Sequence, residues 1–341
     1  MSTYEAAGVD IEAGELAVTL MKDKVARARR PEVVDDASGF AGLFDVSALL
    51  RYQRPLLASS TDGVGTKVMI AQQYGKHDTI GIDLVGMVLD DLVVVGAEPL
   101  FMTDYIACGK VVPELVAEIV GGVAEGCRLA GAALVGGETA EHPGAMGPNE
   151  YDLAGAGTGV VEASALLGPE RVVEGDVVLG MASSGVHSNG YSLVRHVLRE
   201  AALSLDTVLP ELGRPLGEEL LEPTRIYSLD CLELARVVDV HAYAHITGGG
   251  IENNLSRSLP AGLDAVLNRS SWTPPPIFGL LASYGQIAQR DMDRTFNLGI
   301  GMAAVVSADS ADEAIRVLRG RGVDTWVLGE IVPGTGQAHY R

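Results

Sequence analysis

Clusters of glycine that follow strand-like segments constrain this chain more than any other feature of its sequence. The 341 residues include 42 glycines, which are clustered rather than evenly scattered. The clusters cover residues 62–67, 136–139, 183–190 and 247–250, and the last two precede helical segments. Glycine after a strand lets the backbone approach a ligand closely, and the start of a helix offers free N–H groups to an anion. The pattern predicts loops that bind phosphate groups.

In the first half of the chain, short β-branched segments alternate with glycine turns and helical stretches. The segments with strand character cover residues 56–60, 99–107, 133–135 and 152–161. Helical spacing and length predict helices over 78–95 and 113–130, and the second begins with Pro113 and Glu114, a usual helix opening. The first half is therefore predicted to mix helices and strands.

A domain boundary is predicted near residues 167–170, where a Leu-Gly-Pro-Glu stretch precedes a new strand-like run. This divides the chain into domains 1–167 and 168–341, in line with the size expected of two domains. In the second domain we expect strands over 176–182, 241–246, 298–306 and 324–331, and helices over 190–200, 223–238 and 311–319. The fold class is α/β, or α+β.

Charge and hydropathy exclude several classes of partner. The chain carries 45 acidic and 25 basic residues, a formal charge of −20 that opposes binding to nucleic acid. It lacks the roughly 18 apolar residues in a row that a membrane span needs, and residues 1–5 do not resemble an export signal. Three widely spaced cysteines fit buried thiols better than zinc or disulfides. We expect a cytosolic protein.

The loop at residues 62–67 resembles a phosphate-binding loop in composition, although it matches neither the P-loop nor the Rossmann pattern. One interpretation gives Asp62 to a metal ion and Lys67 to a phosphate oxygen. The other is an ordinary turn with two surface charges, and the loop alone does not decide between them.

Two acidic residues, Asp83 and Asp90, are seven positions apart inside an apolar helical segment. A buried carboxylate needs a basic partner or a metal ion, and we favour a metal. A carboxylate about 4 Å from a phosphate oxygen is repelled by roughly 4 kcal/mol at an effective dielectric of 20. Asp62, Asp91 and Glu138 could not face a triphosphate together unless Mg²⁺ bridged them.

His187 is the histidine whose neighbours most suggest chemistry. It could brace its loop, but Ser188, Asn189 and Gly190 beside it suit a phosphate or an amide, which favours substrate contact. Five basic residues between positions 22 and 30 indicate, taken alone, a solvated helix face. The sequence lacks the usual signatures of a catalytic nucleophile or a zinc site.

Taken in order, these segments resemble the phosphoribosylformylglycinamidine cyclo-ligase (AIR synthetase) family, whose superfamily includes formylglycinamidine ribonucleotide synthetase, selenophosphate synthetase and thiamine-phosphate kinase. The resemblance covers nearly the entire chain. The motifs that carry it are residues 4–11, 61–67, 78–84, 96–99, 136–141, 183–195, 222–227, 245–250 and 294–302.

The resemblance implies a two-domain AIR synthetase-like fold whose N-terminal strands form a barrel across a homodimer. It implies ATP and Mg²⁺ as cofactors, with ATP between the domains and across the dimer. The residues implied for ATP are Lys22, Asp62, Gly63, Gly65, Thr66 and Lys67, and those for the metal are Asp62, Asp91 and Glu138. Substrate contacts are implied for His187, Ser188, Asn189, Gly190, Gly248, Gly249, Gly250, Thr295 and Asn297, with Lys67 and His187 as catalytic residues.

One position departs from the family pattern, because Asp90 stands where the family commonly has asparagine. The extra charge could add a metal ligand or could be tolerated at a solvated position.

The activity implied by the resemblance is ATP-dependent ring closure of formylglycinamidine ribonucleotide to aminoimidazole ribonucleotide in purine synthesis. A selenophosphate synthetase would need a reactive cysteine before Cys108, which the sequence lacks. Thiamine-phosphate kinase does not share segments 183–195 and 294–302 as they stand. A regulator that binds ATP without turnover is the alternative from another class.

Overall fold

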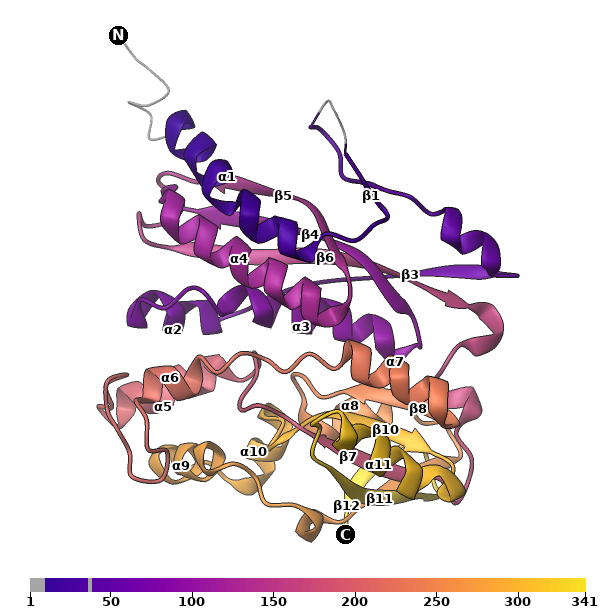
Figure 1. Ribbon diagram of the computed structural model, residues 1–341. Helices are drawn as coiled ribbons and strands as arrows, with labels where there is room; N and C mark the ends of the chain where they lie inside the picture. Colours follow the sequence, from indigo (N-terminus) through magenta and orange to yellow (C-terminus); the bar gives the residue numbers. More distant parts are fainter. Residues whose placement is uncertain (1–9, 36–38) are drawn as a thin grey trace. The chain divides into compact units, whose positions relative to one another are not determined.

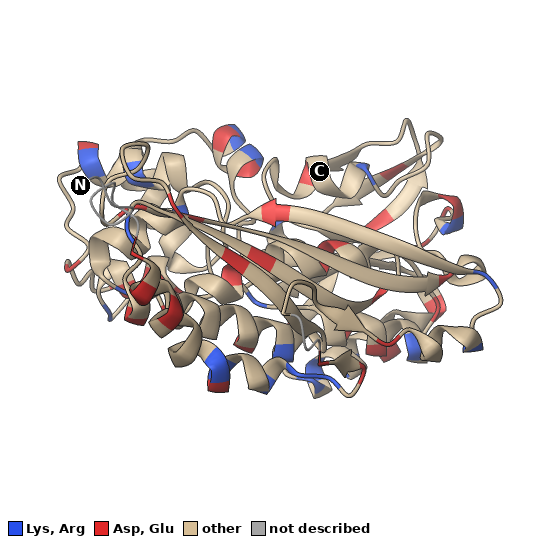
Figure 2. Cartoon of the chain, turned by 90° about the horizontal axis from the view of Figure 1, so that it is seen from above, with Lys and Arg blue, Asp and Glu red and all other residues tan. Residues whose placement is uncertain are grey.

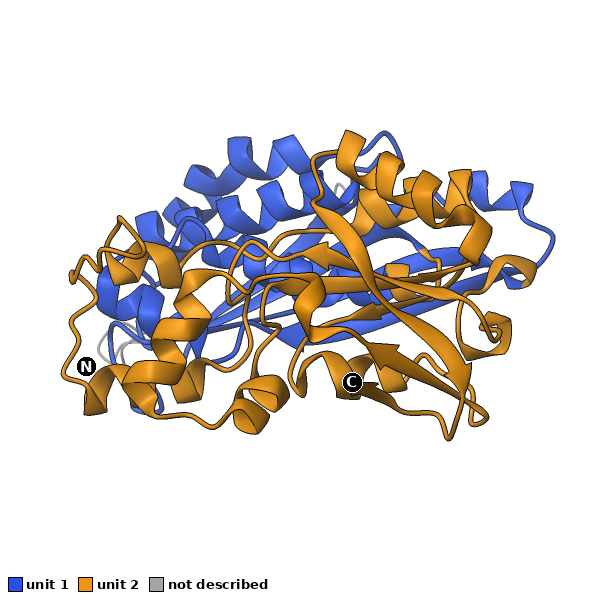
Figure 3. Ribbon diagram, turned by 90° about the horizontal axis from the view of Figure 1, so that it is seen from below, with its two compact units in different colours: residues 1–92, 98–163 blue, residues 93–97, 164–341 orange. Residues whose placement is uncertain are grey.

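The computed structural model describes residues 10–35 and 39–341 and divides the chain into two compact units. The first unit comprises residues 1–92 and 98–163, and the second comprises 93–97 and 164–341 (Figure 3). The sequence had placed the division at 167–168. Residues 4–9 of the first family motif lie outside the described part of the chain.

The first unit contains a four-stranded sheet in the order β3-β6-β4-β5 (Figure 1). Its strands are β3 Pro55–Gly63, β4 Glu98–Cys108, β5 Ala133–Glu141 and β6 Tyr151–Glu162. Strand β6 runs antiparallel to β3 and β4, whereas β4 and β5 are parallel. Parallel neighbours need a crossover connection, which α4 Pro113–Ala130 supplies. The four strands and the helix over 113–130 that the sequence predicted are confirmed.

One face of this sheet is buried against helices and the other is more open. Along β4, Met102, Asp104 and Ile106 are buried while Thr103 and Tyr105 are exposed, as the two-residue period of a strand requires. The other elements of the unit are α1 Ile11–Val25, η2 Ala26–Ala28, β1 Val33–Val34, β2 Leu43–Phe44, η3 Ser47–Arg51, α2 Lys67–Tyr74 and α3 Ile80–Val94, whose last two residues belong to the second unit.

The second unit contains a six-stranded sheet in the order β12-β9-β11-β7-β10-β8. The strands are β7 Val177–Ala182, β8 Val240–His245, β9 Leu263–Leu267, β10 Ile300–Val306, β11 Thr325–Pro333 and β12 Ala338–Tyr340. The α-helices are α5 Tyr191–Glu200, α6 Leu216–Leu220, α7 Ser228–Val237, α8 Gly250–Ser256, α9 Pro276–Gly285, α10 Gln289–Thr295 and α11 Ala311–Gly320. The 3-10 turns are η4 Ala163–Ala165, η5 Pro169–Arg171, η6 Arg269–Ser271 and η7 Ala308–Ser310.

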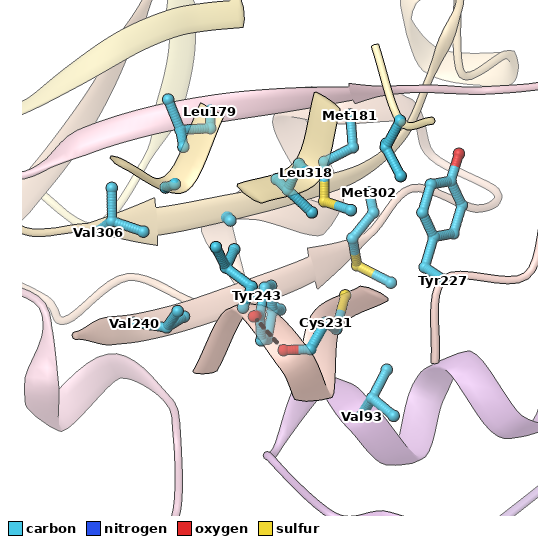
Figure 4. Packing of buried hydrophobic residues seen from close by; sticks show 14 of the residues in the cluster. Val93, Leu179, Met181, Tyr227, Cys231, Val240, Tyr243, Met302, Val306 and Leu318 are labelled. Atoms are coloured by element: carbon cyan, nitrogen blue, oxygen red, sulfur yellow. Dashed lines mark hydrogen bonds between the residues drawn. The ribbon is translucent and has the colours of Figure 1, made fainter. Parts of the chain in front are cut away.

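Both faces of the second sheet are buried. Leu179, Met302 and Leu318 belong to the core on one face, which Figure 4 shows, while Val178 and Val305 belong to the core on the other. Burial on both faces explains why β10 is apolar at every position rather than at every second one. In the core that contains Leu179, the Tyr243 hydroxyl donates to the carbonyl oxygen of Cys231 at 2.7 Å, which satisfies a buried polar group.

Acidic and basic residues are interspersed along the helices (Figure 2), and several form pairs one turn apart. Examples are Glu125 with Arg128 and Glu233 with Arg236. Such exposed pairs each stabilise a helix by only a few tenths of a kcal/mol. Within the described residues, no helix is both long and apolar enough to cross a membrane. The three cysteines are free and buried, as expected.

Candidate functional site

The loop between β3 and α2 follows a strand, as the sequence predicted, and leads through glycines into a helix that the sequence analysis did not predict. The backbone N–H of Gly63 donates to the Asp62 carboxylate at 2.8 Å, and that of Val64 donates to the Leu153 carbonyl at 3.1 Å. Asp62 and Gly65 are exposed, while Thr66 occupies the N-cap position of α2. In the first turn of α2 the backbone N–H groups of Val68 and Met69 donate to the carbonyl oxygens of Gly65 and Thr66 at 3.2 Å each, which closes the loop onto the helix.

Lys67 lies in the interior of the first unit. Its Nζ is 2.7 Å from Oδ1 of Asp83, and both side chains have 0% exposure. Of the two partners considered for Asp83, a basic residue and a metal ion, the structure supplies the basic residue. The contact fixes the start of α2 against α3, so Lys67 anchors the loop at residues 62–67 to the interior of the unit.

The three acidic residues expected to share Mg²⁺ do not come together within the chain. Asp62 pairs with Gly155, Gly155 with Asp104 and Asp104 with Gly137, so Asp62 and Glu138 lie at opposite edges of the sheet. Three strand spacings separate these edges by roughly 14 Å, whereas Mg²⁺ holds its oxygen ligands at about 2.1 Å. Among the described residues, no group of three His, Cys, Asp or Glu side chains is arranged to hold a metal ion.

The neighbouring residues Asp90 and Asp91 differ in their surroundings. Asp90 has 0% exposure, whereas Asp91 is exposed on α3. Solvent therefore reaches the Asp91 side chain and not that of Asp90, and the expected metal contact of Asp91 stays a prediction.

Some side chains of the basic run at positions 22–30 are hydrogen-bonded to the rest of the unit, and others are exposed to solvent. Lys24 donates to the carbonyl oxygen of Ala117 at 3.0 Å, and Arg30 donates to the carbonyl oxygens of Pro99 and Gly131 at 3.0 Å each. Lys22 is exposed in the last turn of α1. The hydrogen-bonded residues hold α1 to the unit and leave Lys22 open to solvent.

Asp104 is a buried acid that the sequence analysis did not single out, although it lies in phase with the buried residues Met102 and Ile106. It is 7% exposed, and a Cβ placed on Gly137 of the next strand would overlap its carboxylate. Burial raises the pKa of the Asp104 carboxyl to about 7, and a hydrogen bond from its own backbone N–H opposes the shift. The carboxyl lies beside the segment that carries Glu138.

Asp104→Asn is expected to stabilise the protein relative to wild type at neutral pH. The pKa of the carboxyl is raised from 3.8 to about 7 in the folded state. The stability that the protonated Asp104 contributes is therefore fully present below pH 3.8 and is lost as the pH rises to about 7. The advantage of the variant should grow across this window by up to about 1.4 kcal/mol per pH unit. Denaturant unfolding at pH 5 and pH 8 measures it, with the exposed Asp152→Asn as control. An advantage that is equal at both pH values would contradict the expectation.

In the second unit, the loop at residues 183–190 follows β7 and is closed by its own hydrogen bonds. The backbone N–H of Ser184 donates to Nε2 of His187 at 3.2 Å. His187 is buried and has a positive φ of 62°. These contacts are those of a loop-bracing histidine, which was the alternative to substrate contact.

Asn297 holds the same loop from a neighbouring segment. Its side-chain N–H groups donate to the carbonyl oxygens of Gly185 at 2.9 Å and Val186 at 3.2 Å. Its Oδ1 accepts from the backbone N–H of Gly299 at 2.8 Å and lies 3.2 Å from the Ser183 hydroxyl, whose single proton also faces the carbonyl oxygen of Gly185 at 2.9 Å. Protein atoms therefore take both side-chain N–H groups and at least one lone pair of the amide. Asn297 therefore positions the loop rather than offering its side chain to a ligand.

The three segments expected to contact substrate meet in the second unit. A Cβ placed on Gly248 would lie 3.4 Å from Oδ1 of Asn189, and one on Gly190 would press on Phe296 and Thr295. One on Gly250 would overlap the carbonyl oxygen of Asp293. The structure thus brings together Ser188, Asn189 and Gly190, the loop from Gly248 through Gly249 to Gly250, and the segment from Thr295 to Asn297.

Comparison with known proteins places the chain in a family. The AIR synthase related protein N-terminal domain matches residues 44–161, and the C-terminal domain matches residues 173–340. The phosphoribosylformylglycinamidine cyclo-ligase of Geobacillus sp. (strain WCH70) is 50% identical over 334 residues, which cover 98% of this chain and 96% of that protein. The same enzyme of Bacillus cytotoxicus is 49% identical over 338 residues, which cover 99% and 97%. The chain belongs to the AIR synthase related family, and within it to the phosphoribosylformylglycinamidine cyclo-ligases.

Solved structures share the fold at much lower identity. Thiamine-monophosphate kinase from Stenotrophomonas maltophilia aligns with a TM-score of 0.66 and 19% identity over 95% of each chain. The hydrogenase maturation protein HypE in complex with ATP aligns with a TM-score of 0.64 and 17% identity, over 94% of this chain and 90% of that one. The expected fold class is confirmed.

Proposed function

We propose that this protein closes the imidazole ring of aminoimidazole ribonucleotide from formylglycinamidine ribonucleotide, with ATP as co-substrate. The proposal rests on the alignment with cyclo-ligases, which covers nearly the entire chain and is identical at about half of the aligned positions. The convergence of three segments in the second unit, two of which are glycine loops, supports it, because glycine lets the backbone approach a bound substrate closely.

The chemistry of the reaction fits a site without a protein nucleophile. The formyl amide oxygen of the substrate attacks the γ-phosphorus of ATP, which releases ADP and leaves a phosphate ester on the substrate. The amidine-side nitrogen then attacks the activated carbon, and inorganic phosphate leaves with loss of a proton. Holding that nitrogen against the carbon contributes up to about 7 to 11 kcal/mol in well-oriented cases. The contribution of the protein is therefore mainly orientation and charge stabilisation.

The phosphates of ATP are proposed to bind at the loop from Asp62 through Gly63, Gly65 and Thr66, with Lys67 as its anchor. This loop is exposed and opens a helix, and a relative of similar fold was solved with ATP. Lys22 is proposed to approach ATP because it is the exposed lysine of its run. His187 and Asn297 are proposed to act through the loop that they brace, and Ser188, Asn189 and Thr295 to contact the substrate.

Mg²⁺ is proposed to accompany ATP, but the described carboxylates of one chain do not form a site for it. Asp62, Asp91 and Glu138 would each need to act on separate ions, or on ions completed by ATP or a second chain. A homodimer in which the strands of the first sheet form a barrel with those of a second chain would supply that chain, and Leu57 on the open face of the sheet is 67% exposed. We also propose a cytosolic location, where purine synthesis takes place.

A coupled assay with purified protein, ATP, Mg²⁺ and formylglycinamidine ribonucleotide tests the function. ADP and aminoimidazole should form in equal amounts, with the aminoimidazole detected by diazotisation. ATP binding without either product would instead favour a regulator or another substrate.

A further inference from the structure

Arg269 forms a cluster with Asp293 of α10 and Tyr340 of the C-terminal strand β12, next to the segments proposed to contact substrate. Arg269 makes a bidentate pair with Asp293, with Nη1 to Oδ1 at 2.8 Å and Nη2 to Oδ2 at 2.7 Å. The guanidinium carbon also lies 3.7 Å from the centre of the Tyr340 ring. Gln289 donates to the same Asp293 carboxylate at 2.9 Å. A guanidinium that pairs through two N–H groups and stacks on an aromatic ring is held in one orientation.

Asp293 connects this cluster to the glycine loop through its backbone. Its carboxylate faces Arg269, while its carbonyl oxygen lies against Cα of Gly250, so closely that a Cβ there would overlap it. Asp293 is 8% exposed. Because a close-packed contact transmits displacement, a shift of Asp293 would move Gly250 or open a gap beside it.

A second connection runs through Trp272. Its ring stacks on Tyr340 with centroids 6.2 Å apart and planes 29° apart, and its Nε1 donates to the carbonyl oxygen of Leu298 at 2.8 Å. Leu298 has a φ of 50°, in the left-handed region that costs a non-glycine residue about 1 kcal/mol or more. The indole N–H thus helps to hold the backbone next to Asn297 in an unfavourable conformation.

We propose that Arg269, clamped between Asp293 and Tyr340, is a positioning residue that sets the geometry of the substrate segments 247–250 and 295–299. The inference rests on the proposed function, because it assigns these segments to the ribonucleotide substrate. Arg269 acts through Asp293 and does not itself contact the substrate. The C-terminal strand β12 is part of the device, since it supplies the ring on which the guanidinium stacks.

Arg269→Met is expected to raise the KM for formylglycinamidine ribonucleotide on the order of tenfold, because small misplacement of binding groups is costly. The KM for ATP should stay essentially unchanged, since its proposed loop lies in the other unit. Arg269→Lys should not restore the wild-type KM, because an ammonium cannot pair bidentately and stack. Tyr340→Phe keeps the ring face and should match wild type, whereas Tyr340→Ala should resemble Arg269→Met.

Arg341→Ala is the matched control, because the side chain of that arginine forms an exposed 3.4 Å pair with Glu330 and its backbone pairing with Leu267 is kept. Hydrogen–deuterium exchange of wild type, Arg269→Met and Arg341→Ala provides a readout that does not require activity. Faster exchange in 247–250 and 295–299 for Arg269→Met alone would support the proposal. A lower Tm with unchanged KM, or unchanged exchange in both segments, would overturn it. If the wild-type protein were inactive but Arg269→Met still exchanged faster in these segments, the proposed function would be wrong and the coupling of Arg269 to the segments would still hold.

Discussion

Lys67→Met is expected to lower the free energy of unfolding by about 3–5 kcal/mol and to abolish turnover. The substitution leaves Asp83 in the interior without its ion-pair partner at 2.7 Å, and both side chains have 0% exposure. Removing one charge of a buried pair costs far more than the pair itself contributes. Denaturant unfolding and the ADP-release assay measure the two effects.

The matched control is Lys76→Met. Lys76 and Asp78 are also 2.7 Å apart, but their side chains are 36% and 59% exposed, so the loss should be below about 1 kcal/mol. The double variant Lys67→Met/Asp83→Leu should recover most of the stability, because apolar replacement of a buried pair is often neutral. Turnover should remain absent. A double variant with wild-type turnover would show that the ion pair is not needed to hold the loop in its active geometry. Equal effects of the two single lysine substitutions would contradict the burial argument.

Gly250→Ala is expected to reduce kcat/KM on the order of a hundredfold. Gly250 has a φ of 71°, which disfavours any other residue by about 1–2 kcal/mol, and a Cβ there would overlap the carbonyl oxygen of Asp293. The loop and α10 must separate to accommodate the methyl group, which displaces the three segments from each other. Steady-state kinetics and thermal unfolding check the two consequences.

Gly279→Ala is the control for this substitution. Gly279 is exposed within α9, and a Cβ there would meet no atom within 4 Å. Alanine at such a position should stabilise the helix by about 0.5–1 kcal/mol without changing kinetics. Wild-type kcat/KM for Gly250→Ala would show that the close approach to Asp293 does not set the geometry of the site.

Much of the fold could be predicted from local pattern. The crossover from β4 through α4 to β5 follows from two strand-like runs separated by a long helix with Pro113 at its start. Other elements lacked such a signal. Helix α9 is apolar over most of its length and α10 has only seven residues, so neither shows clear helical periodicity. Strand β12 is a three-residue edge strand that forms by pairing with β9.

The site was predictable in its segments but not in its contacts. The glycine loops marked the regions that converge in the second unit, yet spacing along the chain does not reveal sheet order. The family resemblance implies a shared metal for Asp62 and Glu138, although β6 and β4 separate their strands. It also implies ligand contact for Asn297, and only the three-dimensional arrangement shows that its amide is held by Gly185, Val186 and Gly299.

The most direct test of the proposed function is to follow the formyl amide oxygen of the substrate through the reaction. Formylglycinamidine ribonucleotide labelled with ¹⁸O at that position would be incubated with the protein, ATP and Mg²⁺, and the inorganic phosphate analysed by mass spectrometry. ATP-dependent ring closure through the amide oxygen predicts one labelled oxygen in each phosphate released, with ADP and aminoimidazole in equal amounts. Unlabelled phosphate, or ADP formed without aminoimidazole, would contradict it.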